Sequence, residues 1–236
     1  MMSNILFIPG TLCTCDVFST QITTLKNAGH NCITFEYGLQ DNLDDVARLA
    51  LSFVNKDERF SICAFSMGGM VAFKLLECCP ERIDKVALIS SNAHADKPNG
   101  RETRGNHLAY ANENGLSALI KDYFTSVYLY NPNDTRMQLI AKMANDTGIE
   151  RYRAQLEILA TRPEAGDLLS NCSHPILLLA GSADVLCPPC EQHRMHQLAA
   201  NSELVFIEQA GHFVSLEQSD KVNLHLYNFF GGAAYA

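Results

Sequence analysis

Six short apolar runs, separated by helix-like segments, set the strongest limit on what this chain can fold into. The runs are rich in Ile, Val, Leu and Phe and lie at residues 5–8, 32–35, 60–65, 86–89, 176–179 and 204–207. Several lack the alternation of a strand with one wet face, which indicates burial on both faces in a parallel sheet. The segments between them carry apolar residues at helical spacing. We expect a three-layer α/β/α fold with a mostly parallel six-stranded sheet and right-handed crossovers.

A long interval between the fourth and fifth runs departs from this alternation. About 80 residues separate these runs, too many for a single crossover helix. Apolar residues at helical spacing recur inside it, near residues 116–123, 139–143 and 152–159. We therefore expect one domain over residues 1–236, with a small helical cap inserted at approximately residues 95–165. The alternative is a helical face of the main core with no role toward substrate.

Charge and composition exclude several classes of partner. The 236 residues carry a formal net charge of -8 and a pI near 5.4, so the chain offers no basic patch for nucleic acid or an anionic membrane. No apolar stretch approaches the roughly 18 residues of a membrane-spanning helix, and the first residues lack the basic region of a signal peptide. We expect a cytoplasmic protein.

A serine at the junction of a strand and a helix is the main candidate for chemistry. Ser66 lies between the run at 60–65 and a helix-like segment at 67–78, where a nucleophile elbow places its serine. Gly68 lets such a turn close, and the Met67 N–H at the start of the helix is a natural donor to an oxyanion. The alternative is a capping serine at an ordinary strand-to-helix turn.

A serine hydroxyl needs a base, and eight histidines compete for that role. His212 follows the last predicted strand on a glycine turn that opens toward the same edge as Ser66. Asp184 follows the fifth strand and faces that edge too, so it suits the task of orienting the imidazole. Asp96, after the fourth strand, is the reserve candidate for the acid.

Read in the chain order Ser66, Asp184, His212, the sequence resembles the α/β-hydrolase superfamily over essentially its whole length. The resemblance rests on the opening loop at 8–12, the elbow at 64–69, a Gly-x-x-Asp stretch at 181–184 and an Ala-Gly-His-Phe stretch at 210–213. It implies an α/β-hydrolase fold that lacks the family's first two strands. The chain departs from the usual pattern twice, with Pro9-Gly10 in place of His-Gly and Ala64 in place of a glycine.

The resemblance implies a serine hydrolase that cleaves carboxylic esters of small to medium acyl groups through an acyl-enzyme. Ser66 would attack the carbonyl as His212 takes its proton, and Asp184 would stabilise the imidazolium. The backbone N–H groups of Met67 and Thr11 would bind the oxyanion, with Leu12 as the less favoured alternative to Thr11. This chemistry requires no metal and no organic cofactor.

Other activities of the same fold stay open. A thioesterase uses the same triad, a non-hydrolytic C–C lyase uses it to abstract a proton, and a scaffold protein keeps the fold without catalysis. The opening loop and residues 151–163 are loosely similar to bacterial hydrolases that stand near the pimeloyl-carrier methyl ester esterases and enol-lactonases, which makes an acyl carrier protein a further candidate partner. Four cap arginines are candidates for a carrier phosphate or a substrate carboxylate, with a solvated helix face as the alternative: Arg101, Arg104, Arg151 and Arg153.

Nine cysteines without an export signal favour free thiols. Spacing alone would permit a metal site or a redox pair in the group Cys187, Cys190, His193 and His196, and Cys13 and Cys15 follow another strand. However, no second spaced pair lies nearby in sequence, and the two prolines at 188 and 189 have the simpler role of starting a helix. We predict no metal site here.

Overall fold

Six parallel strands form one sheet in the computed structural model, which describes residues 2–231. The strand order is β2-β1-β3-β4-β5-β6, and each recorded strand pair is parallel. The strands are β1 (Asn4–Ile8), β2 (Asn31–Thr34), β3 (Phe60–Phe65), β4 (Ile83–Ile89), β5 (Ile176–Gly181) and β6 (Ser202–Ile207). Each of the six apolar runs predicted from the sequence coincides with one of them.

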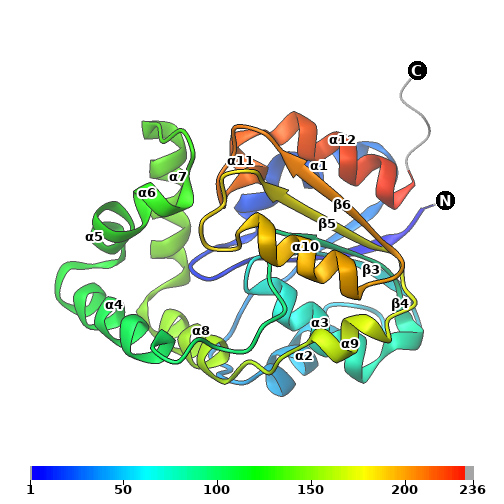
Figure 1. Cartoon of the computed structure of the whole chain (residues 1–236), viewed down its shortest axis with the longest axis horizontal. Coiled ribbons are helices and arrows are strands. Elements are labelled where there is room, and N and C mark those ends of the chain that lie inside the picture. Colours follow the sequence, from blue (N-terminus) through cyan, green and yellow to red (C-terminus); the bar gives the residue numbers. More distant parts are fainter. Residues whose placement is uncertain (1, 232–236) are drawn as a thin grey trace.

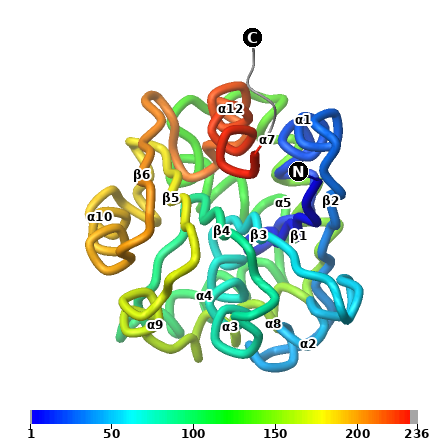
Figure 2. The backbone as a smooth tube through the Cα atoms, turned by 90° about the vertical axis from the view of Figure 1, so that its right-hand side faces the viewer, coloured from blue at the N-terminus to red at the C-terminus, as the bar shows by residue number. Residues whose placement is uncertain are grey.

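Helices cover both faces of this sheet (Figures 1 and 2), which is why the inner strands β3 and β5 are buried along their whole length. In β1, Ile5 and Phe7 belong to one hydrophobic cluster and Leu6 and Ile8 to the other, and all four are fully buried. The first face carries α1 (Ser19–Asn27) and α12 (Ser219–Phe230). The second carries α2 (Leu43–Leu51), α3 (Gly68–Cys78), α9 (Gly166–Ser170) and α10 (Pro189–Leu198). The predicted three-layer α/β/α architecture is confirmed.

A separate group of helices lies between β4 and β5 in the sequence and beside the sheet in space (Figure 1). It consists of α4 (Gly100–Asn114), α5 (Leu116–Leu119), a π-helical turn (Ile120–Phe124), α6 (Thr125–Tyr128), α7 (Asp134–Thr147) and α8 (Ile149–Thr161). Residues of this group complete the first hydrophobic cluster, among them Leu119, Met143 and Tyr152. These helices occupy the interval in which we expect a cap.

The remaining short elements are turns at the ends of strands and helices. They are the 3-10 turns Cys15–Phe18 and Pro80–Arg82 and the helix α11 (Val214–Glu217). Within residues 2–231, no helix has both the length and the apolar character needed to cross a membrane.

Candidate active site

Ser66 occupies a sharp turn between β3 and α3. Its φ is 52°, a left-handed conformation that residues other than glycine rarely adopt. The Ser66 N–H donates to the carbonyl oxygen of Ile89 at 2.9 Å, and Ser91 Oγ donates to the Ser66 carbonyl oxygen at 2.8 Å. A Cβ at Gly68 would lie 2.3 Å from the Ile8 carbonyl oxygen. The turn therefore requires glycine at position 68, and contacts with neighbouring strands hold Ser66 in its strained conformation.

Three residues that follow three different strands form a hydrogen-bonded chain. His212 Nε2 lies 3.0 Å from Ser66 Oγ, and His212 Nδ1 lies 2.9 Å from Asp184 Oδ2. Ser66 follows β3, Asp184 follows β5 and His212 follows β6. The structure thus brings together the hydroxyl, imidazole and carboxylate named from the sequence, connected in the order that base-activated serine chemistry needs.

The Asp184 carboxylate is buried, and both of its oxygens are hydrogen-bonded. Its Oδ1 accepts the N–H groups of Leu186 and Cys187, each at 2.9 Å, while Oδ2 faces His212. Burial on its own would raise the pKa of this carboxyl group, but His212 and the hydrogen bonds outweigh it and hold the pKa below its ordinary value. Asp184 is therefore ionised at neutral pH and fixes the orientation of the ring.

Asp96, the reserve candidate for the acid, lies in a different part of the site. Its carboxylate pairs with Arg104 and Arg162. In the described chain the carboxylate bonded to the imidazole is that of Asp184, so the geometry favours Asp184 for this role.

The loop that carries His212 is anchored to the inserted helices. The buried Glu217 accepts the Gly211 N–H at 2.7 Å and the Asn131 N–H at 2.8 Å. The Phe213 N–H donates to the carbonyl oxygen of Tyr128, whose ring stacks on the imidazole with centroids 6.0 Å apart. Glu217 and Tyr128 are positioning residues that no local sequence pattern pointed to, because their contacts join distant parts of the chain.

The backbone amides of Met67 and Thr11 lie near Ser66 and have no protein acceptor among the described residues. Met67 directly precedes α3, so its N–H lies at the positive end of the helix dipole. The neighbouring Leu12 N–H donates to Gln155 Oε1 of α8 at 2.9 Å and is therefore occupied. Thr11 is therefore a better candidate than Leu12 for the second oxyanion donor. The Thr11 hydroxyl contacts the Met67 sulfur at 3.3 Å.

A cavity of about 270 Å³ opens beside Ser66 and His212. The inserted helices supply part of its wall, including Phe124, Tyr128, Tyr152 and Leu156. A larger hollow of about 470 Å³ lies near the ends of β1 and β2, but the triad residues do not line it. The smaller cavity is the one that reaches the reactive group, and its volume suits a small ligand.

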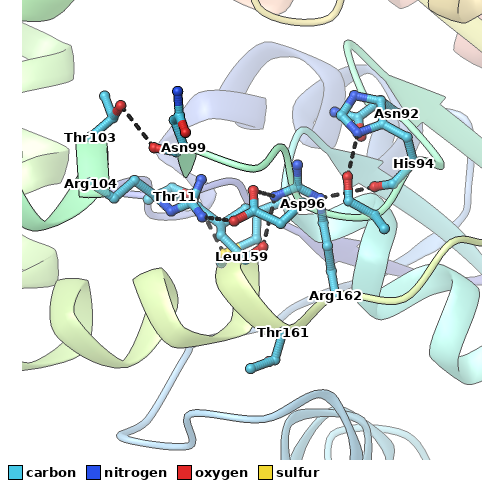
Figure 3. A network of polar contacts seen from close by, with 12 residues as sticks. Thr11, Asn92, His94, Asp96, Asn99, Thr103, Arg104, Leu159, Thr161 and Arg162 are labelled. Atoms are coloured by element: carbon cyan, nitrogen blue, oxygen red, sulfur yellow. Dashed lines mark hydrogen bonds and ion pairs between the residues drawn. The ribbon is translucent and has the colours of Figure 1, made fainter. Parts of the chain in front are cut away.

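Sequence reasoning missed one feature of this cavity, a cluster of charged side chains on its wall. Asp96 lies between Arg104 of α4 and Arg162 just after α8 (Figure 3). Of the four cap arginines named from the sequence, Arg104 alone lines this cavity. Arg162 belonged to no predicted pattern, and only the folded chain places it beside Asp96.

The cysteine and histidine group after β5 does not gather around one point. Cys187 is buried next to Asn92, whereas Cys190 is exposed on α10. On the same helix, His193 packs on a phenylalanine ring and His196 pairs with a serine. Within residues 2–231, Cys187 belongs to one group of three potential metal ligands, together with Asp184 and His212. However, His212 Nδ1 and Asp184 Oδ2 already hydrogen-bond to each other.

The parallel sheet, the strained serine after β3, and the imidazole and carboxylate after β6 and β5 together define an α/β-hydrolase. A family model described as serine aminopeptidase, S33, matches residues 33–219. The chain belongs to this family, and it is an enzyme of the α/β-hydrolase superfamily.

Comparisons with individual proteins find one similar fold and two partly similar sequences. A thermophilic esterase from Thermogutta terrifontis has the same fold, with a TM-score of 0.86 at 20% identity over 97% of this chain and 89% of that one. The chain is 24% identical to the dihydrolipoyllysine-residue acetyltransferase component of the acetoin cleaving system of Pseudomonas putida, over 80% of its own length and 50% of that protein. It is 27% identical to a pimeloyl-[acyl-carrier protein] methyl ester esterase of Nitrosomonas europaea, over 65% of its own length and 64% of that protein. The chain thus spans between half and two thirds of these two curated relatives.

Proposed function

We propose that this enzyme hydrolyses carboxylic esters of small to medium acyl groups through an acyl-enzyme on Ser66. One observation carries the proposal: a single imidazole, that of His212, lies within hydrogen-bonding distance of both the Ser66 hydroxyl and the Asp184 carboxylate. This connectivity lets the ring accept the hydroxyl proton while the carboxylate stabilises the charge that forms. A small-molecule ester is the substrate in this proposal.

The proposed reaction has two halves. In the first, Ser66 Oγ bonds to the acyl carbon as His212 Nε2 takes its proton, and the imidazolium then gives that proton to the departing alcohol. In the second, water attacks the acyl-serine, His212 takes a proton from the water, and Ser66 recovers it as the acid leaves. The Met67 and Thr11 amides would donate to the oxyanion in both halves. No step draws on a metal or an organic cofactor.

The size of the cavity supports the proposed range of acyl groups. Its volume of about 270 Å³ lies at or below the small end of ligand pockets. An acyl carrier protein remains a proposed partner on the strength of the relative named for a pimeloyl-carrier methyl ester. We also keep the expectation of a cytoplasmic location.

The test compares Ser66→Ala with the matched variant Ser52→Ala, which removes an exposed hydroxyl at the end of α2. With p-nitrophenyl butyrate as substrate, we expect Ser66→Ala to lose at least about 1,000-fold in kcat/KM, because the nucleophile is absent. Ser52→Ala should keep the parent rate. A fluorophosphonate probe should label Ser66 in both the parent and the Ser52→Ala protein. Parent-level hydrolysis by Ser66→Ala would overturn the proposal.

Thioester turnover and acyl-serine trapping, measured on the same proteins, separate the alternatives. Butyryl thioester turnover far above oxyester turnover would identify a thioesterase, and substrate conversion without a trapped acyl-serine would favour a C–C lyase. A protein that neither reacts with the probe nor turns over any ester would be a scaffold on this fold.

A further inference from the structure

The charged cluster on the cavity wall contains more positive than negative charge. Arg104 and Arg162 both contact Asp96, and the side chains of these three residues are 17%, 7% and 13% exposed. Two guanidinium groups and one carboxylate leave an excess of one positive charge, since Arg stays protonated at neutral pH. No second carboxylate lies among the residues that line the cavity, whereas Lys97 adds a further cation there.

The two arginines differ in how many of their guanidinium N–H groups have a hydrogen-bond acceptor in the protein. Arg162 donates from Nε to the His94 carbonyl oxygen at 3.0 Å and from one terminal nitrogen to the Leu159 carbonyl oxygen at 2.8 Å. These bonds tie the chain after α8 to the loop after β4. Arg104 reaches Asp96 through one terminal nitrogen, while its buried Nε has no partner within the described residues. Figure 3 shows the Arg104 side chain extending from α4 toward Asp96.

A purely structural role explains Arg162 but not Arg104. One arginine is enough to neutralise Asp96, and a second one withdrawn from water loses hydration that the protein does not replace. A buried donor without an acceptor is likewise unfavourable. The first deficit disappears when an anion enters the cavity beside Arg104, because a carboxylate supplies one negative charge and two acceptor oxygens.

We propose that Arg104, held in place by Asp96 and Arg162, binds a carboxylate group of the ester substrate. This inference rests on the proposed ester hydrolysis at Ser66, because both groups line one cavity. The substrate class is then a half-ester of a dicarboxylic acid, or an ester of a hydroxy acid. A carboxylate matches the excess of one positive charge that Arg104, Arg162 and Asp96 leave, whereas a phosphate monoester carries a charge nearer two at neutral pH. Lys97 is exposed, so water and salt screen its charge and it is not counted in this cluster.

The test uses two pairs of esters in which an isopropyl group replaces a carboxylate of the same shape. Monomethyl adipate and methyl 6-methylheptanoate place the difference on the acyl side, and 3-acetoxypropanoate and isopentyl acetate place it on the alcohol side. We expect the parent enzyme to favour the charged member of at least one pair by roughly ten- to a hundred-fold in kcat/KM, the range of a charge-assisted hydrogen bond. Arg104→Met should lower this preference at least ten-fold, and Arg104→Lys should retain part of it.

The matched control is Arg101→Met on the same helix, whose arginine is exposed and pairs with Glu157 away from the cavity. Its preference should equal that of the parent. Calorimetric titration of the Ser66→Ala protein with each charged ester measures binding without turnover. Failure of the proposed ester hydrolysis can therefore be told apart from failure of carboxylate binding. Thermal melting verifies that each variant is folded.

Three results would overturn the inference. The first is equal turnover of the charged and uncharged members of both pairs by the parent enzyme. The second is full retention of the preference by Arg104→Met, and the third is a preference for 2-acetoxyethyl phosphate over 3-acetoxypropanoate. If Arg104→Met does not fold, the comparison of the parent with Arg104→Lys decides, because lysine keeps the charge but lacks the forked donors. In that case, equal turnover of charged and uncharged esters by the parent enzyme is enough to reject the inference.

Discussion

Backbone strain in this protein is concentrated at individual residues around the candidate active site. Among the described residues, four that are not glycine have a left-handed φ: Leu12, Ser66, Ser90 and Gln209. Each lies within four residues of the carboxyl end of a strand. Such conformations persist only where the surrounding structure holds them. The sheet therefore provides a rigid edge from which the Ser66 and Leu12 turns project toward the cavity.

The glycine after the Ser66 turn offers a direct test of that close packing. In Gly68→Ala, the new methyl group would meet the Ile8 and Pro9 carbonyl oxygens at 2.3 and 2.9 Å, so strand and helix would have to separate. We expect a loss of about 1–3 kcal/mol in the free energy of unfolding and a fall in kcat/KM. Urea unfolding and p-nitrophenyl butyrate hydrolysis measure the two effects.

Gly105→Ala is the matched control for this change. Gly105 lies within α4, and a Cβ there has open space around it. Alanine at this position should stabilise the protein by about 0.5–1 kcal/mol, because it lowers the entropy of the unfolded chain and favours the helix. Equal changes in the free energy of unfolding in the two variants would mean that the close packing of α3 against β1 does not require glycine at position 68.

At the scale of elements, the inserted helices contribute to the chemistry by fixing the opening loop. Gln155 of α8 is almost fully buried, and its Oε1 accepts the Leu12 N–H from the loop after β1. This bond sets the direction of the adjacent Thr11 N–H, the second proposed oxyanion donor. A helix distant in sequence thereby orients a group that would act on the transition state in the proposed reaction.

Removal of the Gln155 acceptor should affect kcat more than KM. Gln155→Leu leaves the Leu12 N–H unpaired, at a cost of about 1–3 kcal/mol, and the loop should shift to recover a partner. We expect kcat for p-nitrophenyl butyrate to fall about ten-fold with little change in KM, because the lost interaction belongs to the transition state. Binding of a phenylboronic acid, which mimics the tetrahedral intermediate, should weaken in parallel.

Glu150→Gln, an exposed change on the same helix, is the control and should leave kcat and boronate binding unaltered. A rise in KM alone for Gln155→Leu would indicate that the loop serves ground-state binding and not the oxyanion.

The elements that could be predicted from the sequence are those with a local signature. Strands such as β3 and β5 are nearly continuous apolar runs, Ser66 lies two residues before Gly68, and His212 directly follows Gly211. Helix α4 has no comparable signature, since Ala111 is its one buried residue, and no apolar stripe marks its position. The pairing of Asp96 with Arg104 and Arg162 depends on where α4 and α8 pack, so no spacing in the sequence reveals it.

The whole molecule keeps its nine thiols in very different environments. All nine are free cysteines. Most lie within or against the two hydrophobic clusters on either side of the sheet, where burial disfavours the thiolate. Burial raises the pKa of the Cys32 thiol to about 11 and that of Cys15 to about 12, and it raises the pKa values of Cys63 and Cys187 well above their ordinary range. Cys78 and Cys190 are the exposed pair.

Thiol alkylation should therefore follow the fold. The thiolate is the reacting species, and a thiol with a pKa of about 11 is ionised to roughly one part in a thousand at pH 8. We expect iodoacetamide at pH 8 to modify Cys78 and Cys190 first, as resolved by peptide mass spectrometry, and all nine thiols once urea unfolds the chain. Because neither exposed thiol lines the cavity beside Ser66, ester hydrolysis should persist after both have reacted. Labelling of Cys15 and Cys32 should rise as the pH is raised toward 10, since the thiolate fraction grows with pH. Early modification of Cys187 in the native protein, together with loss of activity, would show that the loop after β5 opens far more readily than its packing against Asn92 and Asp184 implies.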